Sequence, residues 1–253
     1  MKERTILEVR NLTKDYGRRG VCTQALRGID LIISEHDFIA VMGPSGSGKT
    51  TLLNILSLID KPTQGQVILD ERNIAGLSTQ ELSRLRRDRI SYVFQDHNLL
   101  DTMTLQDNIA LPLALNGVSA SECIRRTDEV GRMFGLDEQL DKYPYQLSGG
   151  QKQRGAACRA LVTEPEILFA DEPTGVLDAD TAEELLDRFR TVNDRKLATI
   201  FMVTHDPYAA SWAKDVYFLN NGAMKCRLSS GNDRREFYAR IMEVQTSMGG
   251  NGT

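Results

Sequence analysis

Short apolar runs alternate along this chain with longer segments in which apolar residues recur every three or four positions. The run Phe38–Met42 (FIAVM) is apolar throughout, which is typical of a strand covered on both faces of a parallel sheet. Helical patterns cover residues 49–58 and 181–192. Further short runs predict strands at residues 66–69, 90–94, 167–170 and 199–203. This alternation predicts an α/β domain with a largely parallel sheet.

The segment from residue 98 to residue 146 has few strand signals and reads as helices, including a polar helix over residues 121–134. We interpret it as a helical insert. Later in the chain, Asn221-Gly222 separates two strand-like runs and favours a type I′ hairpin turn, since both positions tolerate positive φ. The residues from 233 to 244 then form an amphipathic pattern with Phe237, Ile241 and Val244 on one face.

These segments predict one domain over residues 1–253. Its parts are expected at the following residues: a core at about 1–97 and 147–228, the helical insert at about 98–146, and a C-terminal helix at about 233–246.

Composition supports a globular protein and disfavours one class of partner. Hydrophobic residues make up 41% and charged residues 26% of the 253 residues, so a core can form. The formal net charge of −4 argues against nucleic acid as a partner. The four cysteines form no CxxC pair and are expected to be free thiols. Without an apolar stretch long enough for a signal peptide or a membrane span, we expect a cytosolic protein that reaches a membrane only through a partner.

The segment GPSGSGKT follows a predicted strand and opens a predicted helix, which is the context that a phosphate-binding loop requires. Its glycines let successive N–H groups face inward around an anion, and the helix adds its positive N-terminal end. Lys49 is expected to reach the β- and γ-phosphates, and the Thr50 hydroxyl can ligate Mg²⁺. The predicted nucleotide-binding residues here are Gly43, Pro44, Ser45, Gly46, Ser47, Gly48, Lys49, Thr50 and Thr51.

A second helix start suited to phosphate lies at LSGGQ, Leu147–Gln151. Ser148 is a good N-cap residue, and the glycines after it leave backbone N–H groups exposed, although an ordinary capped helix could read the same way. The apolar run that follows ends in Asp171-Glu172. P-loop enzymes hold Mg²⁺ with such a strand-end Asp, and the next carboxylate can polarise an attacking water.

With these motifs in this order, the chain resembles the ATP-binding subunits of ABC transporters over about residues 6–228. The resemblance implies a P-loop NTPase core with a mostly parallel sheet, an antiparallel β subdomain and an α-helical insert. It also implies ATP hydrolysis with Mg²⁺, a homodimer in which two subunits sandwich two ATP molecules head to tail, and a membrane permease as partner.

The resemblance also implies roles for individual residues. Tyr16 resembles the adenine-stacking aromatic, although it could be a half-buried strand residue. Gln95 resembles the glutamine that senses Mg²⁺ and faces the membrane partner, so that Mg²⁺ would be held by Thr50, Gln95 and Asp171. Four residues resemble the signature that contacts ATP on the opposite subunit: Ser148, Gly149, Gly150 and Gln151.

Three further residues resemble parts of the catalytic apparatus. Glu172 matches the catalytic base, Asp178 the D-loop aspartate, and His205 the switch histidine on the γ-phosphate, although a lone histidine could be structural. A neutral imidazole can donate to a phosphate oxygen without adding a full charge. The predicted catalytic residues are Glu172, His205, Gln95 and Lys49.

Some residues depart from the pattern or stand outside it. Gly155 and Cys158 replace a β-branched residue and an alanine in the helix after LSGGQ, and Gly155 either loosens that helix or allows close packing. Val176 replaces a small or amide residue near Asp178, so crosstalk between the two nucleotide sites can differ. The basic run at residues 83–89 is interpreted as a solvated helix face.

The stretch from Val93 to Leu113, with NLLDT and a following TLQDNI, resembles the branch that serves bacitracin-type antimicrobial-peptide resistance. THDPYAAS, Thr204–Ser211, favours the same branch. The wider group includes macrolide-efflux, lipoprotein-release and cell-division subunits, which stay as alternatives. We therefore expect an ATPase that powers or gates a permease at the cytoplasmic face of the bacterial membrane.

Other ABC classes fit less well. The ATPases of DNA repair and chromosome structure carry a long heptad segment between P-loop and signature, and translation-factor proteins carry two cassettes, whereas this chain has one and no sustained heptads. A signalling role, in which the permease activates a partner such as a sensor kinase, would use the same residues and remains open.

Overall fold

The computed structural model describes residues 4–18 and 21–249. A six-stranded sheet lies at its centre, in the order β10-β9-β3-β8-β7-β6, with β10 antiparallel to its neighbour and the other pairings parallel. Its strands are β3 (Phe38–Met42), β6 (Ile90–Val93), β7 (Ile167–Asp171), β8 (Thr199–Thr204), β9 (Asp215–Asn220) and β10 (Ala223–Ser229). Every residue of β3 and β8 is buried, which confirms the strand predictions made from apolar runs.

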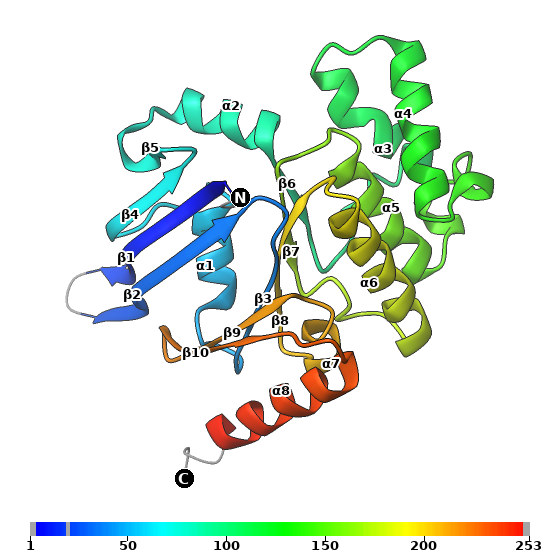
Figure 1. Ribbon diagram of the computed structural model, residues 1–253. Helices are drawn as coiled ribbons and strands as arrows, with labels where there is room; N and C mark the ends of the chain where they lie inside the picture. The colour runs from blue at the N-terminus through cyan, green and yellow to red at the C-terminus, as the bar shows by residue number, and fades with distance from the viewer. Residues whose placement is uncertain (1–3, 19–20, 250–253) are drawn as a thin grey trace.

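A second, four-stranded antiparallel sheet packs against one side of the central sheet (Figure 1), in the order β2-β1-β4-β5. Its strands are β1 (Thr5–Arg18), β2 (Val21–Ser34), β4 (Gln64–Leu69) and β5 (Arg72–Asn73). The run at residues 66–69 predicted β4, but β1 and β2 were not predicted individually. Their pairing shifts register repeatedly, and Asn11 has a φ of 47°, so the alternation of apolar and polar residues is broken.

Helices cover the central sheet and build the insert (Figure 1). The α-helices are α1 (Lys49–Leu56), α2 (Thr79–Arg89), α3 (Leu105–Leu115), α4 (Ala120–Met133), α5 (Gly149–Leu161), α6 (Ala179–Asp194), α7 (Pro207–Ala210) and α8 (Arg234–Gly249). Short 3₁₀ turns lie at η1 (Ile74–Gly76), η2 (Asp137–Gln139) and η3 (Pro144–Gln146). The helices α3 and α4 lie in the segment read as a helical insert, and in α2 only Leu82 is buried, as a solvated helix face requires.

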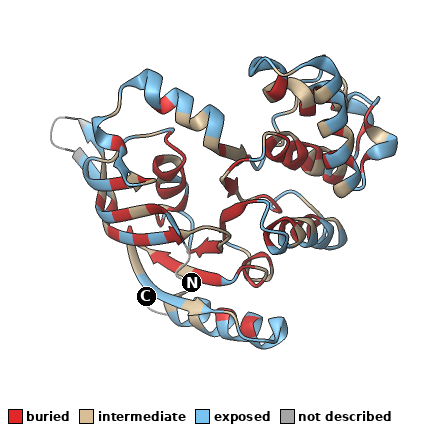
Figure 2. Cartoon of the chain, turned by 45° about the horizontal axis from the view of Figure 1, so that its top comes forward, coloured by how far each residue is buried: buried red, intermediate tan, exposed pale blue. Residues whose placement is uncertain are grey.

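Burial separates two cores on either side of the central sheet. One lies between this sheet, α1 and the antiparallel sheet; the other lies under α5, α6 and the insert. Figure 2 shows the buried strands at the centre and the exposed outer faces of the helices. None of the helices within the described residues is long and apolar enough to cross a membrane.

The departure at Gly155 has a structural reason. A Cβ at this position in α5 would lie 2.5 Å from Cδ1 of Leu105 in α3. The glycine therefore allows close packing of α3 on α5, which decides between the two interpretations made from the sequence. Cys158 on the same helix is buried, and its thiol donates to the Val130 carbonyl at 3.5 Å. Burial raises the pKa of the Cys158 thiol, so it stays protonated.

The turn between β9 and β10 was also predicted correctly. Asn221 and Gly222 have φ values of 49° and 75°, as a type I′ turn requires. The N–H of Gly222 donates to the carbonyl of Ser47 at 3.0 Å, and its own carbonyl accepts from the N–H of Arg27 at 2.7 Å. The hairpin thereby connects the phosphate loop to β2.

Candidate functional site

The phosphate loop lies between β3 and α1, with Gly48 in a left-handed conformation at the helix start. The ammonium of Lys49 donates to the carbonyls of Gly43 (2.8 Å) and Pro44 (3.2 Å). Burial lowers the pKa of Lys49, while the nearby carboxylates of Glu172 and Asp171 act in the opposite direction. The lysine is thus desolvated and held by the loop itself.

The loop fits a phosphate group. The hydroxyl of Ser47 is buried and has no hydrogen-bond partner among the residues that the structure describes. Buried polar atoms are normally paired, so an unpaired one in a loop of this shape indicates room for an oxygen-rich ligand. A cavity of about 450 Å³ opens above the loop. The predicted residues Tyr16, Gln95, Glu172 and His205 line it together with the loop, although they come from distant parts of the chain.

The strand-end carboxylate of Asp171 contacts Thr50, one of the residues that line this cavity. One oxygen is 3.4 Å from the Thr50 hydroxyl, which donates to it, and the other accepts from the Tyr92 hydroxyl at 3.1 Å. Burial raises the pKa of Asp171, and the bond from Tyr92 opposes that effect. A buried carboxylate with an adjacent hydroxyl suits a divalent cation, because such a charge would compensate for lost hydration. The oxygens of Thr50 and Asp171 therefore fit Mg²⁺.

Glu172 and His205 form a pair at the edge of the cavity. Oε2 of Glu172 lies 2.9 Å from Nδ1 of His205 and also accepts from the backbone N–H of His205 at 3.1 Å. Glu172 has a φ of 45°, an unusual conformation for a residue other than glycine. Its carboxylate is 15% exposed and the imidazole is 68% exposed. The acid is thus well fixed, while the ring faces solvent.

Tyr16 lies near the end of β1, where its ring is 43% exposed. Its hydroxyl donates to Oδ2 of Asp60 at 2.8 Å, and the ammonium of Lys14 lies 4.8 Å from the ring centroid. Lys14 also donates to Oδ1 of Asp60 at 2.8 Å. The ring is therefore oriented by two residues that the sequence analysis did not identify.

The predicted signature residues lie at the start of α5, where Ser148 and Gly149 are exposed and Gly150 is buried. Ser148 caps α5, accepting from the N–H of Gln151 at 3.2 Å, while its own N–H donates to the Gln151 side chain at 2.9 Å. Asp178 caps α6 and accepts from the N–H of Thr181 at 2.9 Å. Among the described residues that line the cavity, neither Asp178 nor any signature residue occurs. Within one chain, the helix start at LSGGQ therefore does not share this cavity with the phosphate loop.

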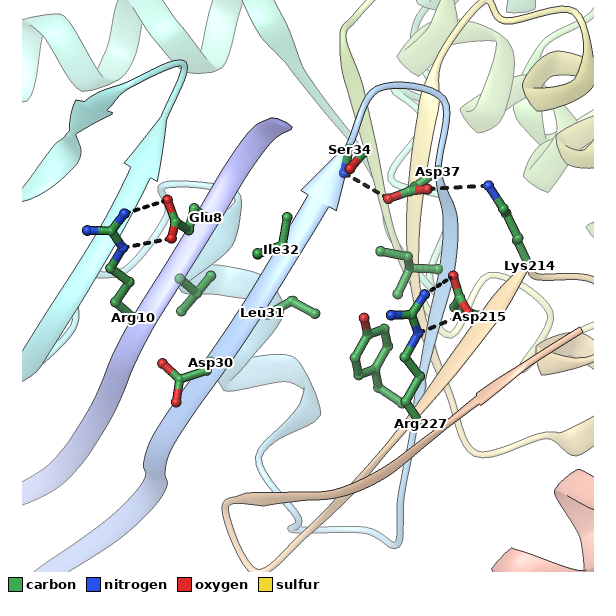
Figure 3. Close-up of a pocket in the computed structure, with 13 residues that line it drawn as sticks. Glu8, Arg10, Asp30, Leu31, Ile32, Ser34, Asp37, Lys214, Asp215 and Arg227 are labelled. Atoms are coloured by element: carbon green, nitrogen blue, oxygen red, sulfur yellow. Dashed lines mark hydrogen bonds and ion pairs between the residues drawn. The ribbon is translucent and has the colours of Figure 1, made fainter. Parts of the chain in front are cut away.

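A larger cavity of about 560 Å³ lies between β2 and the strands β9 and β10 (Figure 3). Charged groups on its walls pair with one another: Glu8 with Arg10 at 2.7 Å, and Asp215 with Arg227 at 2.9 Å. Asp37 accepts from the N–H of Ser34 at 2.7 Å and lies 3.9 Å from the ammonium of Lys214. No predicted site residue lines it in the part of the chain that the structure describes.

The fold and the site define a P-loop nucleotide hydrolase. The ABC transporter family model matches residues 26–175, more than half of the chain, and the chain belongs to this family. BceA of Halalkalibacterium halodurans, a bacitracin export ATP-binding protein, is 42% identical over 246 residues, which are 97% of each protein. The macrolide export ATP-binding/permease protein MacB of Syntrophobacter fumaroxidans is 42% identical over 222 residues, 87% of this chain and 31% of that protein.

A solved relative supports the same assignment. The ATP-binding cassette MJ0796 of Methanocaldococcus jannaschii, in a dimeric post-hydrolysis state with ADP and Pi, superposes with a TM-score of 0.82. The alignment is 37% identical and covers 89% of this chain and all of that one. Together with the family match, this shows that the chain is an ABC ATPase subunit that binds and hydrolyses ATP.

Proposed function

We propose that this chain uses Mg²⁺ and ATP to power or gate a membrane ABC permease that confers resistance to antimicrobial peptides of the bacitracin kind. The observation that carries the proposal is the cavity in which Lys49, Gln95, Glu172 and His205 meet beside the phosphate loop. The export protein BceA, similar over nearly the whole chain, supports the peptide branch.

Different residues of this site are proposed to bind the phosphates, the Mg²⁺ ion and the adenine. Lys49, already desolvated, exchanges its two carbonyl partners for phosphate oxygens, and the loop N–H groups and the Ser47 hydroxyl surround them. Thr50, Gln95 and Asp171 would hold Mg²⁺, which supplies charge neutralisation to the phosphates. Tyr16 offers its exposed ring to the adenine.

Glu172 is the proposed general base, since its fixed carboxylate faces the cavity and can polarise a water. This carboxylate is bound to His205 through the backbone N–H and Nδ1. The proposed role of His205 is to contact the γ-phosphate, and that contact would release Glu172 toward the attacking water. Binding of ATP would thereby place His205 on the γ-phosphate and Glu172 beside the attacking water.

A second copy of the chain completes the proposed site. Five residues at two helix starts do not line the cavity of their own chain: Ser148, Gly149, Gly150, Gln151 and Asp178. Ser148, Gly149 and Asp178 are exposed, whereas Gly150 is buried. A head-to-tail homodimer would bring each set to the ATP of the other copy. The dimeric cassette MJ0796 supports this arrangement.

The proposed contact with the permease lies around Gln95 and the helical insert, about residues 98–146 of the single domain. Phe94 and Leu100 are 38% and 45% exposed here, which suits an apolar partner surface beside the site. Docked there, the chain would lie at the cytoplasmic face of the membrane, with a sensor kinase as a further partner reached through the permease. Macrolide efflux, which the similarity to MacB favours, is the alternative, alongside lipoprotein release and cell division.

The test uses the chain purified with its permease in lipid. Bacitracin-like peptides are expected to stimulate phosphate release, whereas macrolides and lipoproteins are not. Leu100→Glu should abolish the stimulation and the resistance of cells while the isolated chain keeps its ATPase activity. Leu197→Glu, at an exposed apolar position outside the insert, is the control and should keep both. Stimulation by a macrolide alone would move the chain to the alternative branch.

A further inference from the structure

The C-terminal helix α8 is firmly attached to the segment that follows His205. Its buried residues Phe237 and Ile241, 1% and 0% exposed, belong to the same core cluster as Ala209 and Ala210 of α7. At its start, the guanidinium of Arg234 lies 4.1 Å from the centroid of a Trp212 ring and 3.6 Å from a carboxylate oxygen of α6. Apolar packing and these contacts of Arg234 together attach α8 to the segment at residues 207–212.

The second half of α8 contacts the backbone of His205. The side-chain amide of Gln245 donates to the carbonyl of His205 at 3.4 Å. Gln245 and Met248 also line a cavity of about 210 Å³ together with Gly43 and Pro44 of the phosphate loop. Gln245 therefore contacts the backbone of His205 and shares a cavity with the beginning of the phosphate loop.

The backbone of His205 is bonded on both sides. Its N–H donates to Glu172 at 3.1 Å, and its C=O accepts from Gln245. The first bond depends on a carboxylate that the proposed mechanism requires to turn toward water. The second comes from a helix that is anchored in the core. When Glu172 releases the N–H, the bond from Gln245 continues to restrain the peptide that carries the imidazole.

We infer that Gln245 is a positioning residue. Its bond to the His205 carbonyl keeps the imidazole in place during ATP hydrolysis, so that α8 contributes to the ATPase activity. The inference rests on the proposed role of His205. It does not rest on packing by Gln245, because this side chain is exposed and the burial of α8 is supplied by Phe237 and Ile241.

Substitutions that separate hydrogen bonding from packing test this inference on the full chain. Gln245→Met keeps the length of the side chain but removes the donor, whereas Gln245→Lys keeps a donor. Gln245→Met is expected to lower kcat by about two- to tenfold, the range for one modest hydrogen bond, with KM for ATP changed less than about twofold. Gln245→Lys should restore most of kcat. A merely structural role would produce no such contrast between the two variants.

Two reference variants make failures distinguishable. Glu243→Ala changes an exposed residue of the same helix and should keep the wild-type rate and thermal midpoint. His205→Ala should lose most turnover. If Gln245→Met turns over at the wild-type rate, or Gln245→Lys is as slow as Gln245→Met, the inference fails while an inactive His205→Ala keeps the role of His205. If His205→Ala itself keeps the wild-type rate, the proposed role of His205 and the inference both fail.

Discussion

Oε2 of Glu172 lies 2.9 Å from Nδ1 of His205, so the proposed base and the proposed γ-phosphate contact are bound to each other. A carboxylate accepts, so Nδ1 is the protonated nitrogen in this pair when the ring is neutral. The other ring nitrogen then has no proton to offer to phosphate. In this tautomer the ring can donate to a phosphate oxygen only after Nδ1 leaves the carboxylate.

The first prediction concerns the acid of this pair. Glu172→Gln is expected to keep ATP binding but to lose hydrolysis by at least about 100-fold, because an amide cannot serve as a general base. ATP should then hold two copies together, since the bound state no longer decays. Phosphate release and size-exclusion chromatography with ATP measure both effects.

Glu138→Gln, at an exposed position on η2, is the matched control for loss of a carboxylate. It should hydrolyse ATP like the wild type. Wild-type turnover in Glu172→Gln would transfer the role of base to another residue.

The second prediction concerns Tyr16. Tyr16→Ala is expected to weaken the binding of ATP and ADP alike by roughly 1–3 kcal/mol, the usual range for stacking of a base on an aromatic ring. Tyr16→Phe keeps the ring and loses only the hydrogen bond to Asp60, so its effect should be smaller. Calorimetric titration of each nucleotide measures the dissociation constants. Unchanged constants for Tyr16→Ala would leave Tyr16 as a strand residue without contact to the base.

The parts of this molecule that could be predicted are those whose signals are local. The apolar run of β3, the glycines after it and Lys49 lie within a dozen residues, and the strand, turn and helix follow from their own chemistry. The hairpin at Asn221 was predictable for the same reason.

The supporting contacts were missed because they join residues that are distant in sequence. Tyr92 and Asp171 are 79 positions apart, Tyr16 and Asp60 are 44 apart, and Gln245 and His205 are 40 apart. Each side chain alone looks like an ordinary polar residue, and only the fold brings the pairs together. The long strands β1 and β2 could not be predicted for a different reason. Bulges interrupt the two-residue alternation of apolar and polar side chains along them.

The third prediction concerns the pH dependence of stability at Asp171. Its raised pKa means that the folded chain still binds a proton at pH values where the unfolded chain has lost it. Stability therefore falls as the pH rises through the window between the unfolded and folded pKa values, and it stays lower above that window. Asp171→Asn removes this loss and should raise the thermal midpoint of the ligand-free protein at pH 7 by roughly 1–4 °C.

This gain should shrink as the pH falls toward about 4, where the unfolded carboxyl also becomes protonated. Asp187→Asn on the exposed face of α6 serves as control and should show no such trend. Mg²⁺ should stabilise the ATP complex of the wild type and not that of Asp171→Asn. A lower midpoint for Asp171→Asn at pH 7 would contradict the argument.

The last prediction sets two opposing effects at Gly155 against each other. Alanine in a helix interior is favoured over glycine by about 1 kcal/mol, so Gly155→Ala should stabilise α5 by itself. The new Cβ, however, would lie 2.5 Å from Cδ1 of Leu105, which is 0% exposed and cannot move away freely. Overpacking of this kind costs about 1–3 kcal/mol, so we expect a net loss of up to about 2 kcal/mol in the free energy of unfolding.

The sign of the effect should reverse when the neighbour is shortened. Leu105→Ala alone is expected to destabilise the chain by about 2–5 kcal/mol through the cavity that it leaves. In that background no Cδ1 remains for the Cβ of residue 155 to meet, so Gly155→Ala should gain stability from helix propensity and from filling the cavity. Urea unfolding of the four chains measures the double-mutant cycle. If Gly155→Ala changes stability by the same amount and sign in both backgrounds, Leu105 is not the reason for a glycine at this position.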